Sequence, residues 1–139
     1  MAWLDADGQY DPLDLVLLLE RLDATGSAIA SGVRSHRADN WIRRALGRIG
    51  TVLSNMISGC ELRDVDAGIK VIDTEQLDVT RSISDGGFIS TELFRTVGPG
   101  RIVQAPVSHF PRGIGRQSGA SPSTLIGLAV DFFRVLRSA

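Results

Sequence analysis

Two aspartates near the N-terminus are the first residues in the sequence whose types and spacing could do chemistry. Asp5 and Asp7 stand one residue apart, after a short apolar stretch and before a Gly-Gln pair. Two carboxylates can hold Mg²⁺ or Mn²⁺, whose remaining positions are completed by substrate phosphates. At the end of a strand, side chains two residues apart share a face, so both carboxylates would point to one side. The same residues could instead cap a helix or form a turn.

Two other kinds of site begin with the same pattern. An EF-hand calcium loop would need Gly at its sixth position and Glu at its twelfth, where this sequence has Tyr10 and Val16. That interpretation is excluded. A haloacid-dehalogenase-type phosphatase also has a strand that ends in Asp-x-Asp. Its fifth position is usually Thr or Val, whereas Gln9 stands here, so this interpretation is the weaker rival.

The composition indicates one globular domain, and its net charge gives no global sign of nucleic-acid binding. The 139 residues are 43% hydrophobic and 22% charged, and the net charge is −1. All basic residues except Lys70 are arginine, which suits bidentate contact with phosphates. The single cysteine, Cys60, excludes a disulfide framework and indicates a buried side chain in a reducing compartment. With no signal peptide and no apolar run of ~18 residues, the sequence predicts a protein that is soluble or lies on a membrane.

Alternating strand and helix patterns predict an α/β fold that would position these residues. Asp11 and Pro12 start the first predicted helix and Gly26 ends it. An arginine-rich stretch leads into a long helix that ends near Ser58, before Gly59. Strands are predicted at 1–4, 27–33, 67–73 and 101–110, further helices at 75–79, 86–98 and 124–137, and a loop between 110 and 124.

Five segments of the sequence occur in the same order, and at compatible distances, in one enzyme family. Together they resemble family 2 glycosyltransferases of the GT-A fold, on the branch of dolichol-phosphate mannosyltransferase and the bacterial polyprenyl-phosphate glycosyltransferases. The resemblance covers essentially all 139 residues. The segments are LDADGQYDPLDL, GVRSHRADNWIRR, LRDVDAGIKVI, GGFISTELF and VSHFPRGIGRQSGASP.

The resemblance implies a metal site and three catalytic residues. Asp5, Asp7 and Gln9 match the family's DxD region, which binds Mg²⁺ or Mn²⁺ on the donor diphosphate, where the metal acts as a Lewis acid. Asp7, Glu92 and Arg112 are the expected catalytic residues. Glu92 falls where many relatives carry an acidic residue considered as a base. It could equally be a carboxylate that the N-terminus of a helix favours.

The resemblance also implies a set of substrate-binding residues. Arginines among them would contact phosphates, and Asp64 would lie near the floor of the active site with Asp66. Simpler interpretations stay open: Arg43 and Arg44 could form a solvated helix face, Asp64 could pair with Arg63 or another neighbour, and His109 could make a structural hydrogen bond. The expected substrate-binding residues are Arg34, Arg43, Arg44, Asp64, Asp66, Arg112 and Arg116, with Arg37 in the same acceptor-loop region.

The chemistry is consistent with few catalytic groups. A lipid-phosphate acceptor has a second pKa near ~6 and is already anionic at neutral pH. No strong general base is then needed, and positioning and charge neutralisation would account for the rate. This argument favours arginines that face a metal-bound diphosphate over a role for Glu92 as a base.

The resemblance divides the chain into two parts. Residues 1–120 would form a partial GT-A catalytic domain with the metal and acceptor sides of the site. Residues 121–139 would form an amphipathic helix at the membrane interface, although most such helices pack on their own domain. The upstream nucleotide-binding strands of the family are missing before Asp5, so we expect a truncated domain with an exposed sheet edge.

The expected function is that of an inverting, metal-dependent glycosyltransferase. It would move a sugar from a nucleotide-sugar to a polyprenyl (dolichyl or undecaprenyl) phosphate at the inner face of the cytoplasmic membrane. Its partners would be the donor, the lipid acceptor and the membrane surface, with no nucleic acid. The chain alone is expected to bind UDP- or GDP-sugars with Mn²⁺ weakly or not at all. The alternative is a non-catalytic remnant that binds a membrane or a partner.

Overall fold

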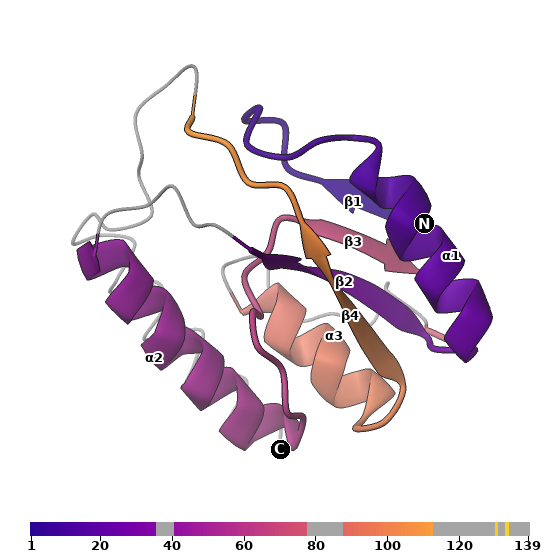
Figure 1. Ribbon diagram of the computed structural model, residues 1–139. Coiled ribbons are helices and arrows are strands. Elements are labelled where there is room, and N and C mark those ends of the chain that lie inside the picture. Colours follow the sequence, from indigo (N-terminus) through magenta and orange to yellow (C-terminus); the bar gives the residue numbers. More distant parts are fainter. Residues whose placement is uncertain (36–40, 78–87, 113–129, 131–132, 134–139) are drawn as a thin grey trace.

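The computed structural model describes residues 1–35, 41–77 and 88–112, together with 130 and 133 (Figure 1). Within the second helix, the side chains of residues 42 and 43 are not described. Strands and helices alternate for most of the chain, as the sequence predicts. The elements are β1 (Ala2–Leu4), α1 (Asp14–Thr25), β2 (Ile29–Arg34), α2 (Trp41–Ser58), β3 (Ile69–Ile72), α3 (Ile89–Val97) and β4 (Ile102–Val107).

The four strands form one mixed sheet in the order β1-β3-β2-β4. β3 runs antiparallel to both of its neighbours, and β2 and β4 are parallel. β1, β2 and β4 therefore share one direction, and their carboxyl ends lie at the same edge of the sheet. The predicted α/β class is confirmed.

Apolar residues alternate along the strands and form a core on each face of the sheet. Ile29 and Ile72 belong to the core beneath α3, whereas Ala30 and Val71 belong to the core beneath α1. This period of two is what a strand covered on both sides requires. The result is a layered domain in which α1 and α3 cover opposite faces (Figure 1).

α2 lies outside α3, and none of its described side chains belongs to either core. It runs along α3, where the hydroxyl oxygens of Ser54 and Thr91 are 2.6 Å apart and both side chains are buried. Its opposite side faces away from the sheet (Figure 1). Gly59 follows the helix at φ +70°, a conformation that side chains disfavour. The predicted end of this helix is thus confirmed.

One of the two short predicted helices is wrong, and the other is confirmed with narrower bounds. The helix expected at 75–79 is wrong for its described part, because residues 74–76 form a turn. An Asp73 carboxylate oxygen accepts the backbone N–H of Glu75, and the other accepts the Gln76 side-chain amide, which favours a turn over a helix. The helix expected at 86–98 is confirmed from Ile89 to Val97.

The predicted C-terminal helix lies mostly outside the described residues. Of its span, only Val130 and Phe133 are described, and both are helical and exposed. The division at residue 120 also falls outside the described part. No helix within the described ranges is long and apolar enough to cross a bilayer.

Candidate functional site

The predicted site residues gather at one edge of the sheet because of the strand directions. Asp5 follows the carboxyl end of β1, Arg34 ends β2, and Arg112 follows β4. The reversed strand β3 begins at this edge, so the segment before it, from Asp64 to Gly68, arrives there as well. Ligands of open α/β sheets bind at such carboxyl ends.

The Asp-x-Asp loop is a turn and not an extension of β1. The strand ends at Leu4, and Ala6 and Asp7 form a turn. We expected strand alternation to place both carboxylates on one side. That argument is wrong, because neither aspartate lies in the strand. Asp7 instead accepts the backbone N–H of Gln9 at Oδ1, at 3.1 Å, which is a local turn contact typical of aspartate.

Asp5 lies directly over Gly68. Its backbone N–H donates to the Gly68 carbonyl at 2.8 Å, and Trp3 Nε1 donates to its Oδ1 at 3.3 Å. A Cβ added at Gly68 would lie 2.0 Å from Asp5 Oδ2 and 2.3 Å from its Cγ. Glycine at position 68 therefore leaves the space that the Asp5 carboxylate occupies.

Asp7 pairs with Arg112, which is 105 residues further along the chain. Arg112 donates from a terminal guanidinium nitrogen to Asp7 Oδ2 at 2.7 Å, and both side chains are partly buried. Burial alone would raise the pKa of Asp7. The hydrogen bonds from Arg112 and the Gln9 N–H outweigh it, so the pKa is lowered. The structure thus joins two of the three predicted catalytic residues in one ion pair.

Gln9 and Tyr10 fasten the Asp-x-Asp loop to the segment after β4. Gln9 is buried, donates from Nε2 to the Phe110 carbonyl at 3.2 Å, and accepts the Phe110 N–H at its own carbonyl at 2.9 Å. The Tyr10 ring packs edge-on against His109, with ring centroids 5.4 Å apart. Ser108 donates its N–H to Asp14 in the first turn of α1 at 2.8 Å. These contacts hold Arg112 near Asp7.

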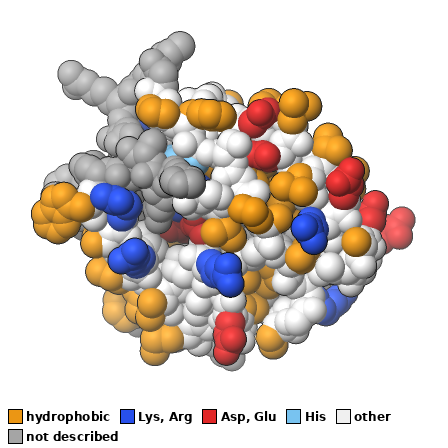
Figure 2. All heavy atoms as spheres, viewed as in Figure 1, with side chains coloured by type: hydrophobic (Ala, Val, Ile, Leu, Met, Phe, Trp, Pro, Cys, Tyr) orange, Lys and Arg blue, Asp and Glu red, His pale blue; other side chains and the backbone are white. Residues whose placement is uncertain are grey.

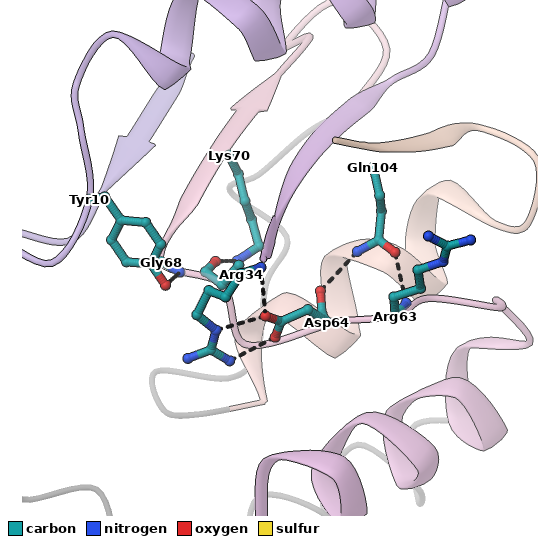
Figure 3. A network of polar contacts seen from close by, with 8 residues as sticks. Tyr10, Arg34, Arg63, Asp64, Gly68, Lys70 and Gln104 are labelled. Carbon is teal, nitrogen blue, oxygen red and sulfur yellow. Dashed lines mark hydrogen bonds and ion pairs between the residues drawn. The ribbon is translucent and has the colours of Figure 1, made fainter. Parts of the chain in front are cut away.

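Arg34 and Asp64 form a buried bidentate ion pair at this edge of the sheet (Figure 3). Arg34 Nε and Nη2 donate to the two carboxylate oxygens at 2.7 Å each, and both side chains are more than nine-tenths buried. Burial alone would lower the pKa of Arg34. The hydrogen bonds and the charge of the Asp64 carboxylate outweigh burial, so the pKa is raised above its ordinary value. Asp64 thus pairs with Arg34 and not with Arg63. Gln104 continues the network by accepting the Arg63 N–H and donating to the Asp64 carbonyl.

Sequence reasoning gave no role to Lys70, Tyr10 or Gln104. Lys70 is 2% exposed, donates to the Ala67 carbonyl and lies about 6 Å from the rings of Trp3 and Phe94. Burial lowers its pKa to about 8, against the opposing effect of Asp66 and Asp5. The Tyr10 hydroxyl accepts the Gly68 N–H at 2.9 Å. For Lys70 and Gln104 the signal was a polar residue at an inward strand position, which the sequence shows only once the register is known. Tyr10 lies in the loop between β1 and α1 and carried no such signal.

The structure spreads the other predicted residues over several elements. Arg44 is exposed on α2, and Arg43 lies in the same helix with an undescribed side chain. Asp66 Oδ2 would be 3.5 Å from a Cβ at Gly50, so its carboxylate lies beside α2. Glu92 is half-buried in the first turn of α3. Arg37 and Arg116 fall outside the described residues.

The donor set at the Asp-x-Asp loop fits one kind of cation. In the described part of the chain, no three His, Cys, Asp or Glu side chains cluster as metal ligands. Asp5 and Asp7 would supply two carboxylates, and Gln9 one amide oxygen. Mg²⁺ and Mn²⁺ accept such a partial set, because water and substrate phosphates complete it. Zinc would require nitrogen or sulfur ligands that this loop does not offer.

Comparison with known proteins identifies bacterial relatives, among them the two described here. No protein-family model matches the chain. It is 28% identical over 130 residues to the polyprenol monophosphomannose synthase of Mycolicibacterium smegmatis, covering 85% of this chain and 49% of that protein. It is 31% identical over 120 residues to the undecaprenyl-phosphate mannosyltransferase of Micrococcus luteus, covering 81% of this chain and 49% of that protein.

The chain therefore spans about half the length of the curated relatives that it matches. Both relatives act on polyprenyl phosphates by name, which is the branch that the five sequence segments indicated. The resemblance to that branch is confirmed by the similarity of this chain to these two proteins.

Proposed function

We propose that this chain forms the metal and acceptor side of an inverting glycosyltransferase of the GT-A fold. The protein to which it belongs would transfer a hexose from a nucleotide-sugar to a polyprenyl phosphate at the inner face of the cytoplasmic membrane. Mannose is the sugar in the names of both relatives, and it is the first sugar to test.

One observation supports this function most directly. The contact between Asp7 and Arg112 places a carboxylate and a guanidinium together at the carboxyl edge of the sheet. Asp5 lies at the same edge over Gly68. A site that handles two phosphate groups needs anionic ligands for a cation and a cationic side chain for phosphate, and these residues supply both kinds of group.

The transfer would be a single displacement at the sugar C1. An oxygen of the lipid phosphate forms a bond to C1, while the bond from C1 to the donor diphosphate breaks and its electron pair leaves with the diphosphate. Configuration at C1 is inverted. Since the lipid phosphate is already ionised at neutral pH, no proton has to be removed, and Glu92 is not required as a base.

The residues of this chain would position the charges for that step. Asp5, Asp7 and Gln9 would hold a divalent cation, which supplies Lewis-acid stabilisation of the leaving diphosphate. Arg112 would then exchange its contact with Asp7 for a phosphate oxygen, which a planar guanidinium can bind in bidentate fashion. Arg34 would act indirectly, because its pairing with Asp64 fixes the floor beneath this site.

A chimeric enzyme tests the proposal. This chain would replace the aligned segment of the M. luteus relative, and transfer of labelled sugar from UDP- and GDP-sugars to undecaprenyl phosphate would be followed with Mn²⁺. We expect transfer by the chimera and a loss of roughly 10²–10³-fold for Asp7→Asn or Arg112→Ala, which is typical for preorganised electrostatic groups.

The matched control is Asp23→Asn, an exposed residue at the opposite end of α1 from Asp14, which contacts the segment after β4. It should leave the transfer rate unchanged. Circular dichroism and thermal unfolding would establish that each chimera is folded. A folded chimera whose transfer is insensitive to Asp7→Asn would contradict the proposed role of the Asp-x-Asp loop.

A further inference from the structure

The outer face of α2 carries an exposed apolar stripe that the proposed chemistry does not use. Trp41 is 72% exposed and Met56 is 77% exposed, at opposite ends of the helix, and Ile49 and Val52 are exposed between them. At 3.6 residues per turn, these four side chains fall within about 80° of the helix circumference. Ser54, which is buried against α3, lies about 180° from the centre of this stripe.

The charges on α2 are of one sign. The helix contains Arg43, Arg44 and Arg48 and no acidic residue in its 18 positions. Arg48 and Arg44 project about 20° and 60° beyond one border of the apolar stripe. Figure 2 shows hydrophobic side chains along the α2 side of the molecule with basic side chains beside them. An apolar face bordered by arginines complements an anionic surface with an apolar interior.

α1 provides an internal comparison. It also exposes apolar side chains, including Val16 and Leu19. However, its sequence DLVLLLERLDAT contains Asp14, Glu20 and Asp23 against the single Arg21. An anionic surface would repel this helix, so exposure of apolar residues alone does not distinguish the two helices. The sign of the charge does.

We propose that the outer face of α2 docks on the surface of an anionic phospholipid membrane. Trp41, Ile49, Val52 and Met56 would enter the boundary between headgroups and acyl chains, while Arg44 and Arg48 contact lipid phosphates. Helices of this kind lie in the plane of the interface. The inference deepens the proposed function, because a lipid-phosphate acceptor must be met at such a surface. It assigns the contact to α2, which follows β2 in the chain and has Gly50 beside the Asp66 carboxylate.

Vesicle binding by the full 139-residue chain tests this proposal. The chain would be sedimented with vesicles of phosphatidylglycerol and, separately, of phosphatidylcholine, without metal or donor sugar. We expect binding to the anionic vesicles that weakens with salt. Val52→Glu should abolish most of it, and Arg48→Glu should lower the affinity by roughly fivefold or more, since each basic residue near an anionic surface contributes about that factor.

The matched control is Val16→Glu on α1, because Val16 and Val52 are similarly exposed, at 55% and 58%. It should bind vesicles like the unmodified chain. In a Trp3→Phe background, Trp41 is the only tryptophan, and brominated acyl chains should quench its fluorescence. Equal loss of binding in both glutamate variants, unquenched Trp41, or no binding by the unmodified chain would overturn the proposal.

Two further outcomes separate this inference from its alternatives. If sedimentation velocity shows a dimer that Val52→Glu dissociates, and vesicle binding is absent, the stripe is an interface between copies and the proposal is wrong. Vesicle binding that persists while the chimera transfers no sugar would support the docking helix and contradict the glycosyltransferase function. The two proposals can therefore fail separately.

Discussion

At the scale of single residues, Arg112 and Asp7 determine each other's charge environment. The guanidinium donates to Asp7 Oδ2 at 2.7 Å, and it is the strongest of the influences that lower the pKa of Asp7. A divalent cation at Asp7 would have to compete with this contact. If Asp7 holds a cation as proposed, the ion pair would link metal affinity to the position of the segment that carries Arg112.

Replacement of Arg112 should raise the pKa of Asp7. In Arg112→Ala the hydrogen bond and the charge are lost, whereas the effect of burial, which raises the pKa, remains. The Asp7 carboxyl carbon would be titrated by NMR, and Arg112→Lys is the control that keeps the charge. An unchanged pKa in Arg112→Ala would show that the ion pair is not formed in solution.

Lys70 should make the stability of the protein depend on pH in the alkaline range. Burial lowers its pKa in the folded state from 10.5 to about 8. Between these values the unfolded chain binds the proton and the folded chain does not, so the free energy of unfolding rises with pH. The destabilising effect of the buried charge is fully present below about pH 8.

Lys70→Met removes this effect and provides the measurement. We expect the variant to be more stable at pH 7 by about 3 kcal/mol at most, since one pKa unit corresponds to about 1.4 kcal/mol. The difference between the two proteins should shrink between about pH 8 and 10.5. Urea unfolding across that range measures it, and because Tyr10 is present in both proteins, its own titration cancels. A constant difference would contradict the lowered pKa.

At the scale of elements, two glycines near the site differ in whether they can be replaced by alanine. A Cβ at Gly68 would lie 2.0 Å from the Asp5 carboxylate, whereas one at Gly50 in α2 would lie 3.5 Å from Asp66. The first position forces Asp5 to move. At the second position the added Cβ would make an ordinary van der Waals contact.

Gly68→Ala should therefore destabilise the fold by about 1–3 kcal/mol, as is usual for overpacking, and should weaken Mn²⁺ binding at the Asp-x-Asp loop. Gly50→Ala, the matched substitution, should stabilise it by about 0.5–1 kcal/mol, because alanine favours a helix. Thermal unfolding and Mn²⁺ titration followed by electron paramagnetic resonance would measure both. Equal metal binding in the two variants would show that Asp5 does not depend on Gly68.

At the scale of the whole molecule, the sequence predicted the class of fold well and the turns poorly. Short, largely apolar segments located all four strands, and alternation supported only the last of them. Glycines located the ends of α1 and α2. These signals are local, so the sequence shows them directly. The helix expected at 75–79 failed because Asp73 binds its own backbone two residues further on. The sequence alone could not decide whether Asp64 pairs with Arg34 or with Arg63. The choice depends on the strand pairing that brings the end of β2 next to the segment before β3.

The order of the strands predicts which parts of the sheet are most protected. β2 and β3 each lie between two strands, whereas the three residues of β1 pair only with β3 within the described chain. We expect the slowest amide hydrogen exchange in Ile29–Val33 and Ile69–Ile72, and exchange at least about tenfold faster in Ala2–Leu4. Equal protection of β1 would indicate that another strand covers its outer edge.

The contacts that build the site also determine when it can form during synthesis. Asp7 meets Arg112 across 105 positions, Gln9 meets Phe110 across 101, and Asp14 meets Ser108 across 94. Contacts of such long sequence separation slow folding, because the loop entropy must be lost before they form. While residue 112 is still inside the ribosome, the Asp-x-Asp loop has no Arg112 to pair with. Cation binding during translation would therefore encounter two free carboxylates, and the final arrangement would be set only as the end of the chain emerges.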